Sequence, residues 1–337
     1  MRRSISSGFF VFVVGILFCL FNIGLCHAQE KYTMRFSHGL PEDHFIAKQY
    51  KEWATLIDER SKGVLKVEIY PSAQLFKDQE LIRAIQMGTI ESGGAYTFNI
   101  GRSVSEFNIL DVPFLFHTTE ESFKVAKSEV GTLLIRAAEK QGIKVLAWFP
   151  FPQEGFAILS KKPLKVPSDC KGLVARVTGP PSAQLIKLWG GGASHLSGAE
   201  MYMGLQRGTL GATFATIETS VERKMYEVAP YSVILHWGMV FAMPLMNTEF
   251  FNKLPKELQE IVVDTALEVE KKTVQRALEI NATAKRVLEE KGYPPYIPTK
   301  EENALWEKDT QPVRESAVEA ASGGKELIKK IDSLLKR

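Results

Sequence analysis

The segment from Pro255 to Lys291 most constrains the fold, because it contains no internal proline or glycine. Its apolar residues recur at helical spacing and form one stripe, Leu258, Val262, Ala266, Val269, Ala277, Ile280, Ala284 and Val287. At about 1.5 Å per residue, one helix of that length spans about 55 Å, which exceeds the width of a single lobe. We therefore predict a helix that bridges two lobes. The alternative is two helices broken near Asn281, where Asn and Thr lower helix propensity.

Strand and helix patterns alternate along the rest of the chain. Apolar runs predict strands at residues 32–37, 64–70, 90–96, 143–149, 156–160, 172–177, 212–217 and 239–246. Amphipathic stretches between them predict helices, and this order is typical of an α/β fold with a largely parallel sheet. Pro244 interrupts the last run, which suits a strand that crosses back to the first part of the molecule.

Residues 1–28 have the pattern of a secretory signal peptide. Two arginines precede an apolar run at residues 9–25, and small residues precede a cut ahead of Gln29. We therefore expect a cleaved, exported and soluble protein in the periplasm. An uncleaved anchor is one alternative, because the apolar run is nearly long enough to span a bilayer. A lipoprotein attached through Cys26 is another, although bulky Leu25 stands where such signals have a small residue.

Cysteine and charge content exclude two further possibilities. Cys19 and Cys26 lie in the predicted signal peptide, so the exported chain keeps only Cys170 and cannot form an internal disulfide. The whole chain has 42 Lys and Arg against 39 Asp and Glu, and no basic stripe with interleaved aromatic residues is present. Such a balance provides no surface for polyphosphate, so nucleic acid is not an expected partner.

The exported chain is long enough to form two lobes. We place lobe I at residues 29–152, with a return segment at about 240–280. Lobe II is placed at residues 153–239, with C-terminal helices at about 281–337. The bridging helix predicted above would then belong partly to each lobe.

One arginine stands at the carboxyl end of a short apolar strand. Gly172 opens this strand after a Pro-Ser-Asp turn, Leu173 and Val174 are apolar, and Arg176 follows. Open α/β sheets form ligand crevices at that edge. A guanidinium holds a carboxylate through two parallel hydrogen bonds and stays charged at biological pH. Arg176 is therefore a candidate carboxylate anchor, and the alternative is a solvated surface arginine.

Motifs for catalysis, nucleotide binding and metal binding are absent or weak. The sequence has no G-x-S-x-G, H-E-x-x-H or P-loop pattern, so we predict no catalytic residue and no cofactor. Cys170 has no histidine near it in sequence. Glu154 and Glu218 could approach each other as in a lyase or hydrolase, and turnover would distinguish that case. His38 and His44 flank one loop, but their spacing matches no strong zinc pattern, so capping or ligand hydrogen bonding is favoured over a metal.

Several short motifs together resemble one family. They are Pro41 and His44, Tyr70-Pro71 with Gln74-Leu75, residues 111–116, Pro167, Asp169, Gly172 and Arg176, and finally Glu200, Tyr202, Leu205, Gln206 and Gly208. Their order and spacing resemble the DctP-type periplasmic solute-binding proteins of tripartite ATP-independent periplasmic (TRAP) transporters. This resemblance implies a two-lobed periplasmic binding protein fold, with a long helix bridging both lobes, that closes over an acidic ligand.

The resemblance also implies a ligand site. Arg176 matches the arginine that binds the ligand carboxylate in that family, and the other candidates are Phe156, Gln153, Tyr96, Phe214, Ala215, His38, His44 and Trp237. Ala157 stands where many relatives have a second arginine, and Ala215 where they often have asparagine. Loss of polar groups at two positions favours a monocarboxylate with a partly apolar body, such as a 2-oxo, hydroxy or aromatic acid, over a sugar acid or dicarboxylate.

Two kinds of partner follow from the resemblance. One is the small organic acid, and the other is the pair of small and large integral membrane subunits of a TRAP transporter, driven by an ion gradient. A periplasmic sensing module for a membrane receptor is the alternative. Neighbouring genes for transporter subunits or for a sensor kinase would distinguish the two.

Overall fold

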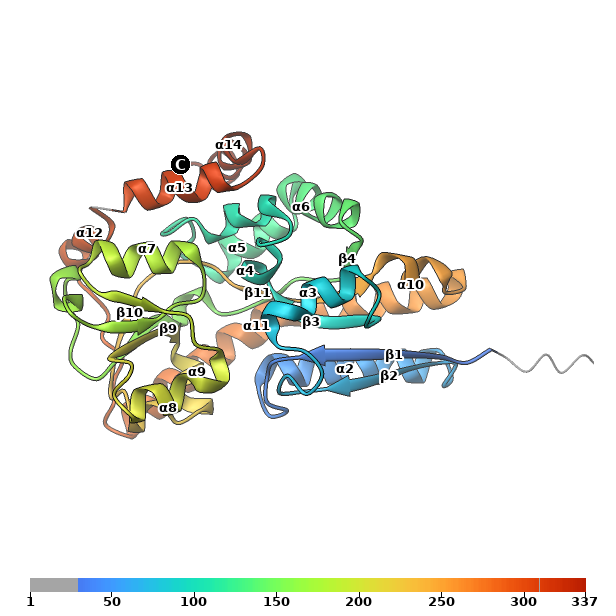
Figure 1. The fold of residues 1–337 in the computed structure, drawn as a ribbon, viewed down its shortest axis with the longest axis horizontal. Helices are drawn as coiled ribbons and strands as arrows, with labels where there is room; N and C mark the ends of the chain where they lie inside the picture. Colours follow the sequence, from blue (N-terminus) through green and yellow to red (C-terminus); the bar gives the residue numbers. More distant parts are fainter. Residues whose placement is uncertain (1–29, 309) are drawn as a thin grey trace, which may run out of the picture.

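The computed structural model describes residues 30–308 and 310–337, which form two sheets with helices packed around them (Figure 1). The predicted signal peptide, including Cys19, Cys26 and the cut ahead of Gln29, lies outside the described residues. Within those described ranges, no helix combines the length and the apolar character needed to cross a bilayer.

The first sheet has the strand order β2-β1-β3-β11-β4, with β5 also paired to β11. Its strands are β1 (Tyr32–His38), β2 (Leu65–Tyr70), β3 (Ser92–Tyr96), β4 (Ile143–Val145), β5 (Phe149–Pro150) and β11 (Phe241–Asn247). β11 is antiparallel to β3 and β4, with Leu245 opposite both Gly93 and Val145. The predicted return of the chain to the first lobe is therefore confirmed.

Pro244 is tolerated inside this sheet because it lies beside the gap between β4 and β5, which pair with different parts of β11. It lies where the partner of β11 changes from β4 to β5, and its carbonyl accepts a hydrogen bond from the Leu146 N–H at 3.0 Å. A proline removes one ladder donor. Here that missing donor falls beside the break in the neighbouring strand, so the ladder on either side remains intact.

The second sheet comes from one continuous part of the chain and has the order β10-β6-β9-β7-β8. Its strands are β6 (Phe156–Ser160), β7 (Val174–Arg176), β8 (Gly192–Ser194), β9 (Ala212–Thr216) and β10 (Tyr231–Ile234). β6 is antiparallel to β9 and β10, whereas β7 is parallel to β8 and β9. Both sheets are thus mixed, and the prediction of a largely parallel sheet is wrong, because strand and helix alternation does not record the direction of the returning strands.

Short helices cover both sheets. Those around the first sheet are α2 (Phe45–Arg60), α3 (Asp78–Gln86), α4 (Thr97–Ile100), η1 (Ser105–Asp111), α5 (Thr119–Ala126), α6 (Glu129–Lys140) and α10 (Thr248–Lys253). Those around the second are η2 (Gln153–Gly155), η3 (Pro167–Cys170), α7 (Pro180–Leu188), η4 (Gly198–Glu200), α8 (Met201–Gln206), α9 (Ile217–Glu222) and η5 (Met225–Glu227). Side chains cap several of them, as the Thr118 hydroxyl does by accepting from the Glu121 N–H.

The long helix α11 (Lys256–Glu290) is continuous for 35 residues and contacts both lobes (Figure 1). At one end the Trp53 indole of α2 donates to the Val262 carbonyl at 3.2 Å. At the other end Ala284 and Leu288 pack in a cluster of buried side chains below the second sheet. The bridging helix is therefore confirmed, and the predicted alternative of a break at Asn281 does not occur.

The C-terminal helices are α12 (Lys300–Lys308), α13 (Gln311–Ala320) and α14 (Gly324–Leu335). Trp306 of α12 packs edge-on against Trp189 of the second lobe. By contrast, α14 packs against η1, α5 and α6 of the first lobe, and α13 contacts both η1 and α7. The contacts of α14 therefore differ from the predicted assignment of the whole segment 281–337 to lobe II, because an amphipathic pattern shows that a helix is buried but not against which surface.

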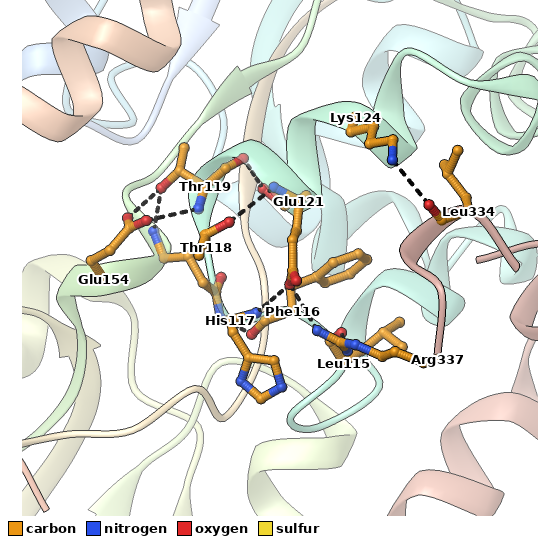
Figure 2. Close-up of polar contacts among 12 residues, drawn as sticks. Leu115, Phe116, His117, Thr118, Thr119, Glu121, Lys124, Glu154, Leu334 and Arg337 are labelled. Carbon is orange, nitrogen blue, oxygen red and sulfur yellow. Dashed lines mark hydrogen bonds and ion pairs between the residues drawn. The ribbon is translucent and has the colours of Figure 1, made fainter. Parts of the chain in front are cut away.

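Polar contacts fix the end of the chain to α5 (Figure 2). The Arg337 guanidinium lies 2.8 Å from the Glu121 carboxylate and donates to the Leu115 carbonyl. The Lys124 ammonium donates to the Leu334 carbonyl at 3.0 Å. These bonds hold the end of α14 against the first lobe along α5.

Candidate functional site

A cavity of about 90 Å³ lies between the two lobes. One water needs roughly 10–15 Å³ of such space, so the cavity is large enough for a small organic molecule. The first lobe lines it with Gly39, Leu40, His44, Asp78, Tyr96, Phe98 and Phe151, and the second with Phe156, Arg176, Thr178, Gly198, Met201, Phe214, Ala215, Thr216, Thr219 and Arg223. Trp237 and Val240 line it from the segment that leads into β11.

Arg176 lies where β7 ends, as the sequence predicts. Backbone carbonyls hold its side chain: Nε donates to Leu196 at 3.1 Å and Nη1 to Phe214 at 3.3 Å. Burial lowers its pKa to about 10, so the guanidinium stays charged at neutral pH. No carboxylate of the described residues lies within 4.0 Å of it. A half-buried cation that is fixed by its backbone bonds and has no charged partner is suited to bind an anion.

Arg223 is a second guanidinium on the cavity wall, and the sequence did not indicate it. It follows the last residue of α9, and its Nη1 donates to the Gly198 carbonyl at 2.6 Å. Its Nε is buried and has no partner among the described residues. The charge of Arg223 is close enough to lower the pKa of Arg176, after the larger effect of burial. Together the two arginines make the second-lobe side of the cavity positive.

Asp78 faces these cations from the first lobe. It is the first residue of α3, and its carboxylate packs against Gly39, where an added Cβ would lie 2.2 Å from Asp78 Oδ1. A side chain at position 39 would therefore displace the carboxylate. Burial raises the pKa of Asp78, and the charges of Arg176 and Arg223 lower it.

Aromatic rings form the apolar walls. Tyr96 stacks on Phe98 with ring centroids 5.1 Å apart, and Trp237 packs edge-on against Phe156 and Phe214, each at 5.1 Å. Burial raises the pKa of the Tyr96 hydroxyl, which keeps it neutral. Tyr96, Phe156, Phe214 and Trp237 are all expected site residues, and they line the cavity; their contact with a ligand stays a prediction.

The two histidines differ in position. His44 lines the cavity, but its Nδ1 caps α2 by accepting from the Ile46 N–H at 3.1 Å, and burial lowers its pKa. His38 is not among the cavity-lining residues; its Nδ1 accepts from the Leu40 N–H, and burial lowers its pKa to about 4. Within the described part of the chain, no group of three His, Cys, Asp or Glu residues could hold a metal ion.

Gln153 is also absent from the cavity wall, contrary to expectation. It is buried where the chain passes between the lobes, and its Nε2 donates to the carbonyls of Phe116 at 3.0 Å and Gly238 at 2.8 Å. The backbone N–H of Gln153 donates to the Thr119 hydroxyl. That hydroxyl in turn donates to the Glu154 carboxylate (Figure 2). Gln153 therefore joins crossing segments of backbone, and we predict that its role is structural.

We expect Gln153→Leu to lower the free energy of unfolding by about 1–3 kcal/mol, because two buried carbonyls lose their donor. Urea unfolding monitored by circular dichroism measures this change, with exposed Gln206→Leu as the control. Ligand affinity of the folded variant should stay within about twofold of the parent. A large loss of affinity at unchanged stability would instead return Gln153 to the ligand site.

The two alanines behind the monocarboxylate prediction are not equivalent. Ala157 and Ala215 are opposite each other in β6 and β9, so both side chains point to the same face of the second sheet. Ala215 lines the cavity, whereas Ala157 is fully buried and does not line it. The assumption that both alanines face the cavity is therefore wrong for Ala157. Only Ala215 still supports the loss of a polar group from the cavity wall.

The two carboxylates of the lyase or hydrolase alternative do not meet in the cavity. Glu154 accepts from the N–H and hydroxyl of Thr119, as Figure 2 shows. Glu218 is buried beside Gly155 and Asn281, behind the cavity wall. Neither residue lines the cavity, so neither is positioned as an acid or base for a molecule bound there.

The fold and the site define a class: two α/β lobes joined by crossing segments and a bridging helix, with a polar cavity between them, as in solute-binding proteins. The family model described as "Bacterial extracellular solute-binding protein, family 7" (DctP) matches residues 36–320. The chain belongs to this family, the TRAP periplasmic solute-binding proteins of the DctP type.

Individual relatives agree with this assignment. The chain is 27% identical over 294 residues to the C4-dicarboxylate-binding periplasmic protein DctP of Rhodobacter capsulatus, covering 86% of this chain and 87% of that protein. It is 30% identical over 242 residues to the 2,3-diketo-L-gulonate-binding periplasmic protein YiaO of Escherichia coli, covering 70% and 72%. A TRAP periplasmic solute-binding protein from Desulfovibrio salexigens, solved with bound orotic acid, superposes with a TM-score of 0.83 at 25% identity, covering 90% and 98%.

Proposed function

We propose that this protein is the periplasmic receptor of a TRAP transporter and captures a small monocarboxylate with a partly apolar body, such as a 2-oxo, hydroxy or aromatic acid. The observation that carries the proposal is Arg176, a half-buried guanidinium that lines the interlobe cavity without a carboxylate partner among the described residues. Relatives that bind organic acids support the broader class, since their names and bound molecules include C4-dicarboxylates, 2,3-diketo-L-gulonate and orotic acid.

The charge of the cavity supports a ligand with one carboxylate. Arg176 and Arg223 contribute two positive charges and Asp78 one negative charge, while His44 and Tyr96 are neutral. The lining therefore carries a net charge of about +1, which one carboxylate neutralises. A dicarboxylate would leave an excess negative charge in a closed cavity, and buried charge without a partner is costly. Burying the ligand body against Phe98, Phe156 and Trp237 adds a hydrophobic contribution.

The proposed mechanism is capture by closure of the lobes. The arginines belong to the second lobe and Asp78 to the first, so a ligand that contacts both favours the closed state by its differential affinity. The crossing segments near Gln153 and Gly238, together with α11, connect the lobes and have to accommodate their relative movement. In this proposal the closed protein then delivers the acid to the small and large membrane subunits.

A thermal-shift screen of the exported protein against organic acids tests the ligand class, followed by calorimetry of the hits. A ligand at 100 times its dissociation constant adds about 2.7 kcal/mol of stability, which is readily detected. We expect monocarboxylates such as 2-oxo, hydroxy or aromatic acids to bind most tightly. If a C4 dicarboxylate or a hexuronate binds more tightly than every such monocarboxylate, the proposed ligand class is wrong, although the family assignment stands.

A further inference from the structure

Asp78 is the only carboxylate among the described residues that line the cavity. Among those residues, none donates a hydrogen bond to the carboxylate oxygens of Asp78. Neither Arg176 nor Arg223 lies within 4.0 Å of these oxygens, the distance that defines an ion pair. Asp78 is half-buried, and the charges of both arginines are close enough to influence its ionisation. Once a solute displaces water from the cavity, a carboxylate in this position needs a donor from that solute.

The surrounding residues offer no obvious replacement for that donor. Gly39, against which the carboxylate packs, has no side chain, and the hydroxyl groups that line the same cavity, those of Tyr96, Thr178, Thr216 and Thr219, form no hydrogen bond with Asp78. Burial raises the pKa of Asp78 and the charges of Arg176 and Arg223 oppose that rise, and an ionised carboxylate can only accept hydrogen bonds. The missing partner must therefore bring a hydrogen of its own.

We infer that the solute carries, besides its carboxylate, an N–H or O–H donor that Asp78 accepts from the first lobe. This inference rests on the proposed function, because it takes the carboxylate to be bound by Arg176 on the opposite wall. It narrows the ligand class to hydroxy acids and to acids with a ring or chain N–H. A simple 2-oxo acid would direct an acceptor toward Asp78 and bind less well.

Matched pairs of acids that differ only in the donor provide the test. We use lactate with 2-methoxypropionate, mandelate with α-methoxyphenylacetate, and pyroglutamate with the lactone 5-oxotetrahydrofuran-2-carboxylate. Calorimetry on the exported protein should show tighter binding of the donor-bearing acid, by about 10-fold or more, in at least one pair. In Asp78→Asn this preference should fall below about threefold, because a neutral amide oxygen is a weaker acceptor.

A second measurement separates recognition from structural support. Asp78→Asn raises the net charge of the cavity from about +1 to +2, so the variant should gain affinity for the dicarboxylate malate relative to lactate. The exposed residue Asp58, changed to Asn, is the control and should change neither ranking. Thermal unfolding of each variant confirms that it is folded.

Three results would overturn the inference. The first is equal or tighter binding of the donor-free member in every pair. The second is the same loss of affinity for both members of a pair in Asp78→Asn. The third is absence of binding by all three donor-bearing acids while other monocarboxylates bind. Failure of the proposed function looks different, because dicarboxylates would then bind most tightly to the parent protein.

Discussion

Arg176→Ala is expected to weaken binding of the cognate acid by roughly 100-fold or more. The change removes the cation that faces the ligand carboxylate, and breaking a buried ion pair by loss of one partner costs about 3–5 kcal/mol. Since about 1.4 kcal/mol corresponds to a tenfold change in affinity, the loss should be plain in a calorimetric titration. The carbonyls of Leu196 and Phe214 lose a donor in this variant, so its thermal unfolding is measured beside the titration.

Two further variants make this result specific. Arg176→Lys should recover only part of the affinity, because an ammonium keeps the charge but cannot form the two parallel bonds of a guanidinium. Arg207→Ala removes an exposed arginine from the end of α8 and should leave affinity unchanged. Unchanged affinity in Arg176→Ala, with Arg207→Ala equally inert, would remove Arg176 from the site.

Glu218→Gln is expected to stabilise the protein at neutral pH. Glu218 is fully buried on α9, and no described residue forms a hydrogen bond to either carboxyl oxygen. Burial, together with the charges of Glu222 and Glu154, raises the pKa of Glu218 to about 8 from an ordinary value of 4.5. The folded protein therefore holds a proton that the unfolded chain has released. Between these two pH values the free energy of unfolding falls as pH rises, because the folded state binds more protons.

Glutamine is neutral at every pH and has nearly the same shape, so it removes that penalty. We expect a gain on the order of 3 kcal/mol at pH 7 and a much smaller gain near pH 4.5. Urea denaturation at several pH values measures the difference from the parent, with exposed Glu260→Gln as the control. Glu222 and Asp111, whose pKa values burial raises to about 7, should retain some pH dependence in both proteins. A Gln variant no more stable than the parent at pH 7 and 8 would show that Glu218 is ionised and paired.

Sequence reasoning predicted best where a local pattern determines the structure. The long apolar stripe without Pro or Gly predicts α11, and the run at residues 156–160 coincides with β6. Arg176 was found because a glycine turn and an apolar strand place it at a sheet edge. In each case the controlling interactions lie within a few residues of one another in sequence.

Residues that depend on tertiary packing were harder to predict. Arg223 follows α9, a helix of six residues that is too short to show a periodic apolar pattern. The neighbouring sequence therefore does not indicate that Arg223 reaches the cavity. In the sequence, Asp78 has the pattern of an ordinary first residue of a helix. Its position in the cavity depends on the close approach of Gly39. His38 and Gln153 carry suitable chemistry, but their bonds to backbone groups turn them away from the cavity wall.

The place of β11 in the first sheet bears on the order in which the molecule can assemble. β11 lies between β3 and β4, yet it follows the entire second sheet along the chain. When the chain is synthesised from its N-terminus, all strands of the second sheet are present by residue 234. At that point the first sheet still lacks β11. Pairing across so large a sequence separation is entropically costly and slow. The N-terminal lobe should thus be the last part of the molecule to become native.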